Sequence, residues 1–190
     1  TNFTEKDVRL IAQMHKAITV IQFKLEAAII DRRPEFEMAN RKLLHMIDFE
    51  RGVFCYDGRE YEMTDTFFPT IDPKNPYQLT PDEQELVEKI HISFINSEKL
   101  KKHMRCLFTY GGMYLVCNNN LLYHASIPMN ADGSFKHVKI GEKEYWGEKL
   151  LAKSDQLIRT AYFGEEGEDK DYALDFVWYM WCGANSPLFD

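Results

Sequence analysis

The stretch that decides the fold of the second half of the chain is Leu121-Leu122-Tyr123-His124-Ala125-Ser126-Ile127-Pro128. Its apolar run predicts a short strand, which the proline brings to an end. A histidine at the carboxyl end of a strand is well placed to bind a metal, because the strand fixes its direction and small residues leave room beyond it. The same pattern is also typical of a structural histidine, which is the commoner case. From these residues alone both interpretations of His124 stay open.

The residues before this strand predict its neighbour. Met113–Cys117 has the apolar composition of a buried strand, and Asn118-Asn119-Asn120 is a turn sequence. Two strands joined by so short a turn are expected to pair in an antiparallel hairpin. A second hairpin is predicted at 138–145 about Gly141.

Composition bounds the class of protein. The chain has 190 residues, of which 45% are hydrophobic, so it can form one large domain or two small ones. Its net charge is −7 and its charges are mixed along the chain, which argues against a nucleic-acid partner. Four scattered cysteines suggest neither a disulfide framework nor a zinc site. We find no apolar run long enough to span a membrane and no signal-like amino terminus, so we expect a cytoplasmic protein.

The first half of the sequence is mainly helical. A long helix is predicted from Thr4 to Ile30, ended by Pro34, and a short helix from Met38 to Ile47. A β-hairpin follows about Asp57-Gly58, a pair that favours a type I′ turn. After an irregular, proline-rich connection, Thr80-Pro81-Asp82-Glu83 predicts the start of another helix that runs to Ile95.

Positive charge gathers on one predicted helix, which starts after Ser97 and ends at Gly111-Gly112. We consider two roles for its basic side chains. They can bind a phosphate of a substrate, in which case Lys99, Lys102 and His103 are the candidates. They can equally form a solvated helix face.

Two further helices are predicted, over 150–162 and 172–182, with an acidic loop between them. The last contains Phe176-Val177-Trp178-Tyr179-Met180-Trp181. Six consecutive apolar residues on a helix cannot all face one core, so part of this run must be covered by other elements or stay exposed. The elements together predict an α+β fold of helices with short antiparallel strands, and the sequence contains no complete catalytic motif.

Several stretches together resemble the class III fructose-1,6-bisphosphatases of Firmicutes and related bacteria. They are His15–Ile18, Ile21–Glu26, Ile30–Pro34, Ser97–Leu100 with His103-Met104, Asn120–His124, Trp178–Trp181 and Ser186–Phe189. The resemblance implies a manganese-dependent enzyme of gluconeogenesis, in the calcineurin-like metallophosphoesterase superfamily. Such an enzyme hydrolyses fructose 1,6-bisphosphate to fructose 6-phosphate and phosphate. His124 then falls on the metal-binding histidine of the superfamily, with Ala125-Ser126 in place of the usual Gly-Gly.

The resemblance also implies a fold and a division of the chain. Residues 97–190 would be a portion of the superfamily's β-sandwich flanked by helices, carrying the His124 strand. Residues 1–96 would be a helical segment with an inserted β-hairpin subdomain.

The other ligand motifs of the superfamily, which include Asp-x-His, Asn-His-Asp/Glu and a late Gly-His, are absent from these residues. The chain also lacks an initiator methionine, so we expect a piece of a longer protein, inactive alone and unable to hold manganese. We expect it to self-associate through apolar surface near Ile18, Ile21, Trp178 and Trp181. The alternative is a non-enzymatic interaction or regulatory domain on the same scaffold; part of a protein phosphatase is a weaker third possibility.

Overall fold

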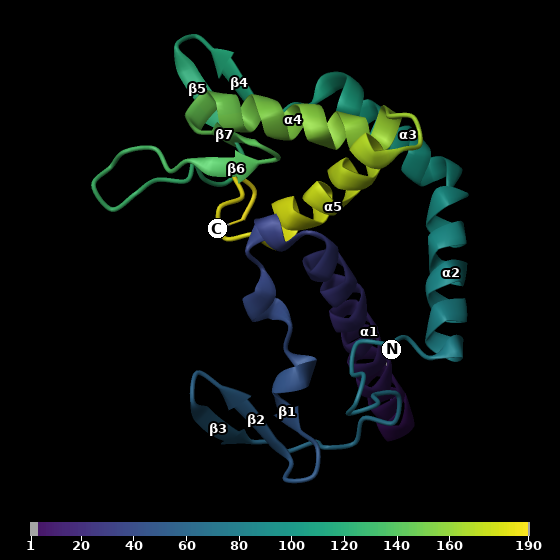
Figure 1. The fold of residues 1–190 in the computed structure, drawn as a ribbon. Helices are drawn as coiled ribbons and strands as arrows, with labels where there is room; N and C mark the ends of the chain where they lie inside the picture. Colours follow the sequence, from purple (N-terminus) through teal and green to yellow (C-terminus); the bar gives the residue numbers. More distant parts are fainter. Residues whose placement is uncertain (1–3, 190) are drawn as a thin grey trace. The chain divides into compact units, whose positions relative to one another are not determined.

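The computed structural model describes residues 4–189. The chain forms two compact units, Thr1–Ile95 and Asn96–Asp190, which are described in turn (Figure 1). Both contain helices and small antiparallel sheets, of three strands in the first unit and of two and two strands in the second. The predicted α+β class is therefore confirmed.

The first unit begins with the long helix α1 (Glu5–Arg32). Its start is a capping box, in which the backbone N–H of Asp7 donates to Thr4 Oγ1 at 3.2 Å and that of Thr4 donates to Asp7 Oδ2 at 2.9 Å. These hydrogen bonds from Thr4 lower the pKa of the Asp7 carboxyl. The helix ends at Arg33, immediately before Pro34, as predicted.

The two halves of α1 differ in burial. In the carboxyl-terminal half Val20, Ile21, Ala27 and Ile30 are buried, whereas the amino-terminal half leaves its apolar side chains exposed. The exposed residues there are Val8, Leu10, Ile11, Met14 and Ile18. The prediction of exposed apolar surface is therefore right for Ile18 but wrong for Ile21, whose side chain packs in the interior at 4% exposure.

The predicted short helix over 38–47 is wrong. The chain instead makes three single 3₁₀ turns, η1 (Pro34–Phe36), η2 (Ala39–Arg41) and η3 (Leu44–Met46). Their backbone N–H groups bond three residues back, which suits short pieces of chain. Leu44 enters the core with Val20 and Ile71, and this contact is made without a continuous helix.

A three-stranded sheet follows, in the order β1 (Ile47–Asp48), β2 (Val53–Tyr56) and β3 (Arg59–Glu62). Strands β2 and β3 are antiparallel, with Phe54 opposite Tyr61. Asp57 and Gly58 between them have φ values of 49° and 70°, the positive angles that a type I′ turn requires. The hairpin prediction is confirmed.

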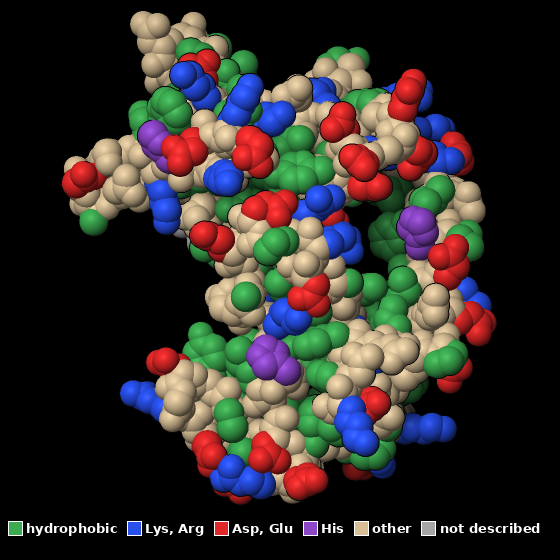
Figure 2. All heavy atoms as spheres, viewed as in Figure 1, with side chains coloured by type: hydrophobic (Ala, Val, Ile, Leu, Met, Phe, Trp, Pro, Cys, Tyr) green, Lys and Arg blue, Asp and Glu red, His purple; other side chains and the backbone are tan. Residues whose placement is uncertain are grey.

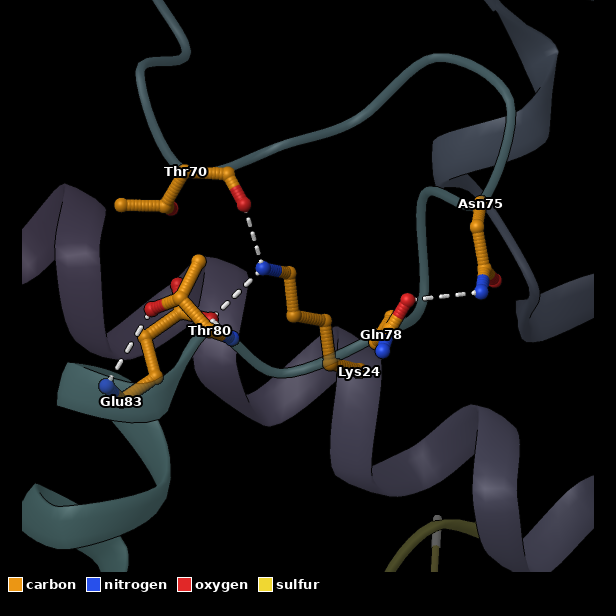
Figure 3. Close-up of polar contacts among 6 residues, drawn as sticks. All are labelled: Lys24, Thr70, Asn75, Gln78, Thr80 and Glu83. Atoms are coloured by element: carbon orange, nitrogen blue, oxygen red, sulfur yellow. Dashed lines mark hydrogen bonds and ion pairs between the residues drawn. The ribbon is translucent and has the colours of Figure 1, made fainter.

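An ion pair buried in the first unit was not predicted from the sequence (Figure 3). Lys24 of α1 donates to the carboxylate of Glu83 at 2.7 Å and to the backbone carbonyl oxygen of Thr70 at 2.6 Å. Glu83 lies in the first turn of α2 (Pro81–Ile95), where it forms the predicted cap with Thr80. The pair therefore ties α1 to the irregular connection and to the start of α2.

The second unit is built around two packed helices, α4 (Gly147–Phe163) and α5 (Glu168–Cys182). Its buried apolar side chains include Leu150, Leu151, Leu157, Ala173, Phe176 and Met180. Helix α5 starts four residues before the predicted position, because Glu168, Asp169 and Asp171 in its first turn suit the positive end of a helix. Val177 and Trp181 are exposed at 40% and 80%, so the apolar run of α5 is indeed shared between core and surface.

Three smaller elements complete the second unit: helix α3 and two hairpins. Helix α3 (Glu98–Tyr110) is capped by Ser97, as predicted. Strands β4 (Tyr114–Cys117) and β5 (Asn120–Tyr123) form the expected antiparallel hairpin, and β6 (Val138–Ile140) pairs with β7 (Lys143–Tyr145).

The prediction that 113–117 is a buried strand is wrong for most of its residues. Met113 is buried, but Leu115 and Val116 are 58% and 61% exposed. Leu115 pairs with Leu122 and Val116 with Leu121, so these pairs lie on opposite faces of the hairpin and both faces carry exposed apolar side chains. Hydrophobic side chains are visible at several places on the face shown in Figure 2.

Across residues 4–189 no helix is both long and apolar enough to cross a membrane.

Candidate functional site

His124 is the first residue after β5, and its side chain is exposed. The loop that follows is half-buried and is held by the last residues of the chain. The backbone N–H of Ser126 donates to the carbonyl oxygen of Pro187 at 3.3 Å, and its hydroxyl donates to that of Phe189 at 3.4 Å. The loop at Ala125-Ser126 is thus held in place by the hydrogen bonds of Ser126.

The segment that holds this loop is itself anchored by Ser186. The Ser186 hydroxyl is buried, donates to the carbonyl oxygen of Met180 at 2.6 Å and accepts the backbone N–H of Leu188 at 3.1 Å. Because Met180 belongs to α5, the direction of the chain after His124 is set by the packed helices of this unit.

The surroundings of His124 do not complete a metal site. Within the described part of the chain, no three histidine, cysteine, aspartate or glutamate side chains come close enough together to hold a metal ion. A catalytic metal usually takes at least three ligands from the protein. These residues alone therefore do not fit a manganese site, and His124 is available as a single ligand.

The three candidate phosphate ligands of α3 lie together on one exposed face. Lys102 and His103 follow Lys99 by three and four residues, and all three side chains are solvent-exposed. Lys101, by contrast, pairs with Glu98 at 3.0 Å. The face is basic and accessible to solvent.

Helix α3 is held against α4 by one arginine. The guanidinium of Arg159 donates to the carbonyl oxygens of Phe108 and Gly111 and pairs with Asp155 at 2.6 Å. The Asp155 carboxylate raises the pKa of Arg159. The aromatic ring of Phe108 also lies 4.7 Å from that of Tyr162. The basic face is therefore presented by a helix with a fixed carboxyl-terminal end.

Sequence reasoning missed a hollow in the same unit, with a volume of about 600 Å³. It is lined by Asn130, Ser134, Phe135, Lys136, His137 and Trp146. The sequence does contain a signal for it: Asp132-Gly133 is a turn, and a turn that returns the chain beside itself brings the polar residues on its two sides together.

Comparison with known proteins decides the family. The profile described as "Firmicute fructose-1,6-bisphosphatase" matches residues 1–190, which is the whole chain. The chain belongs to the Firmicute fructose-1,6-bisphosphatase family. The resemblance stated from the sequence is therefore confirmed.

Several curated proteins of the Firmicute fructose-1,6-bisphosphatase family are similar to this chain. A protein of Bacteroides thetaiotaomicron named "Fructose-1,6-bisphosphatase class 3" is 75% identical over 100% of this chain and 29% of its own length. Proteins of Parabacteroides distasonis and Clostridium beijerinckii with the same class name are 62% and 54% identical, each over 98% of this chain and 28% of the relative. The chain thus spans less than a third of the length of these relatives. No solved structure matches it significantly.

Family membership does not change the set of candidate site residues in this chain. His124, the basic face of α3 and the hollow about Lys136 all belong to the second unit. Any further ligands would have to come from parts of a longer family member that these residues do not include.

Proposed function

We propose that this chain is part of a fructose-1,6-bisphosphatase that hydrolyses fructose 1,6-bisphosphate to fructose 6-phosphate and phosphate, in the cytoplasm and in gluconeogenesis. One observation carries the proposal: a relative named "Fructose-1,6-bisphosphatase class 3" is 75% identical over the full length of the chain. The residues alone are expected to be inactive, because a phosphatase of this class needs ligands that they do not supply.

In this proposal His124 is one ligand of a manganese site in the full-length protein. Its support is its position after β5, its exposure, and a following loop that α5 and the carboxyl-terminal segment hold in place. Bound manganese would supply charge neutralisation at the attacked phosphoryl group. The remaining ligands would come from outside this chain.

The proposal also assigns the β4–β5 hairpin to a larger β-sandwich of the metallophosphoesterase type. Both faces of the hairpin carry exposed apolar side chains, a pattern typical of strands that are covered on both sides. Residues 1–96 would then be a helical segment with an inserted β-hairpin subdomain. Strands of the longer protein would pair with the hairpin and cover it.

The test uses the full-length protein with manganese. We expect the wild type to release phosphate from fructose 1,6-bisphosphate, and His124→Ala to bind manganese more weakly and lose most of its activity at limiting manganese. His91→Ala, which changes an exposed histidine of α2, is the control and should behave as the wild type.

Two results would contradict the proposal. A wild-type protein that hydrolyses no fructose 1,6-bisphosphate would refute the function. Normal turnover by His124→Ala at limiting manganese would refute the role of His124 alone.

A further inference from the structure

Lys136 lines the hollow beside the 130–137 loop and has no protein partner among the described residues. Lys136 is half-buried, and its side chain forms no ion pair or hydrogen bond with the residues that the structure describes. The other lysines of residues 4–189 that are not fully exposed all have a partner. They are Lys16, Lys24, Lys42, Lys153 and Lys170.

An unpaired cation that lines a hollow points to an anionic ligand. No carboxylate of the described residues pairs with Lys136, so its charge is available to a ligand. The chain as a whole has an excess of acidic residues, so carboxylates are not scarce. A phosphate is an anion that a lysine commonly binds as a point charge.

The loop that carries Lys136 is fixed by its own hydrogen bonds. The backbone N–H of Asn130 donates to the carbonyl oxygen of Ser134 at 2.8 Å, and that of Lys136 donates to the carbonyl oxygen of Pro128 at 2.9 Å. Asp132 accepts both the backbone N–H and the hydroxyl of Ser134. A ligand that binds here does not have to order the loop first, which favours affinity.

The aromatic residues that line the hollow are also held in place. The imidazole of His137 stacks on the indole of Trp146, with ring centroids 4.3 Å apart, and its Nδ1 lies 2.9 Å from Glu144. Gly147 has a φ of 51°, and a Cβ atom there would lie only 3.4 Å from the ring of Phe135. Glycine at this position thus lets Phe135 pack against the start of α4.

The combination defines a class of ligand. The ring of Phe135, which is 48% exposed, offers surface to the C–H groups of a sugar. The Asn130 side-chain oxygen can accept a hydrogen bond from a sugar hydroxyl, whereas the Asn130 amide N–H groups and the Ser134 hydroxyl already donate within the loop. A volume of about 600 Å³ accommodates a molecule of this size. Lys136 would bind a phosphate at one end of it.

We infer that this hollow binds a phosphorylated sugar, with Lys136 contacting a phosphate group. The inference rests on the proposed function, because it takes fructose 1,6-bisphosphate as the ligand. It adds a substrate subsite whose phosphate-binding residue is Lys136.

The test measures binding and turnover separately in the full-length protein. Lys136→Met should weaken fructose 1,6-bisphosphate binding about ten-fold or more in calorimetry without manganese, because a charge-assisted contact is lost. It should raise KM with a smaller effect on kcat, and Lys136→Arg should recover much of the affinity. Lys143→Met changes an exposed lysine of β7 outside the hollow and serves as the control.

The outcomes separate this inference from the proposed function. Binding that depends on Lys136 in a protein without phosphatase activity would support the subsite and refute the proposed reaction. Active wild-type protein with unchanged binding and KM in Lys136→Met would refute the subsite. A wild-type protein that does not bind fructose 1,6-bisphosphate would also refute it, as would equal weakening by Lys136→Met and Lys143→Met.

Discussion

At the scale of single residues, Lys24 is the clearest case of a charge that the fold depends on. Its side chain is 0% exposed and its only carboxylate partner in the described structure is Glu83 (Figure 3). We expect Lys24→Met to lower the free energy of unfolding of the first unit by about 3 kcal/mol, because it leaves a buried carboxylate unpaired. Amide hydrogen exchange in α2, measured by mass spectrometry, should rise accordingly.

Lys16 provides the matched control for this prediction. Like Lys24, it is a lysine of α1 that pairs with a carboxylate, here that of Asp65. The side chains of Lys16 and Asp65 are 29% and 61% exposed. Lys16→Met should change stability by no more than about 1 kcal/mol. Equal effects of the two substitutions would mean that burial does not determine the importance of the Lys24 pair.

Titration of the Glu83 carboxyl makes the stability that the Lys24–Glu83 pair contributes depend on pH. Burial acts to raise the pKa of its carboxyl, but hydrogen bonds from Lys24 and from the backbone N–H of Thr80 outweigh this, so the pKa is lowered. A carboxyl with a lowered pKa contributes stability above its unfolded value of about 4.3, and that contribution is lost as the pH falls through the folded value.

Glu83→Gln tests this linkage. Denaturation of the wild type and the variant between about pH 6 and about pH 3 should show a smaller loss of stability on acidification in Glu83→Gln, because the titrating group is gone. Parallel curves for the two proteins would show that Glu83 does not titrate as described.

At the scale of elements, the sequence predicted those whose ends are determined by local contacts. The box of Thr4 with Asp7, the Asp57-Gly58 turn and the cap of Thr80 with Glu83 each form within four residues. Their chemistry is therefore complete in the sequence, and the structure has all three. The antiparallel pairing of β4 with β5 was predicted from the turn between them, although Asn120, predicted as part of the turn, is the first residue of β5 and pairs with Cys117.

The errors concern features that depend on distant residues. The segment predicted as a helix over 38–47 forms 3₁₀ turns instead, and its Leu44 packs with Val20 and Ile71, far away in the sequence. Likewise an apolar strand such as β4 is buried only if something covers it, and composition cannot show that. The Lys136 hollow was missed for this reason too, since Trp146 joins it from ten residues away.

Helix α3 carries the prediction that belongs to this scale. Double replacement of Lys99 and Lys102 by Met in the full-length protein should raise the KM for fructose 1,6-bisphosphate several-fold if the basic face binds a phosphate. Steady-state kinetics measures this, with Lys101→Met as a control on the same helix. An unchanged KM would mean that the basic face of α3 is a solvated surface and binds no phosphate of the substrate.

At the scale of the whole chain, exposed apolar surface is the main feature. Trp181 is 80% exposed, Met14 is 61% exposed, and the β4–β5 hairpin is uncovered. We expect the 190-residue chain to self-associate, because patches of this kind are rarely left in contact with water. Sedimentation velocity over a range of concentrations should show dimers or larger species.

Trp181→Lys should reduce this association. Ala152→Lys adds the same charge at an exposed position of α4 without removing a large apolar side chain, and it should have little effect. A chain that stays monomeric at every concentration would contradict the expectation.

The Lys24–Glu83 pair has one more consequence, which concerns temperature. Hydration of charged groups becomes less favourable on heating, so burying such a pair costs less in warm than in cold water. Hydrophobic stabilisation per unit area does not grow in the same way. The first unit should therefore rely increasingly on this contact as it is heated, and the difference in stability between wild type and Lys24→Met should widen. A contact that ties α1 to α2 at ordinary temperature would then matter most close to the point at which the unit melts.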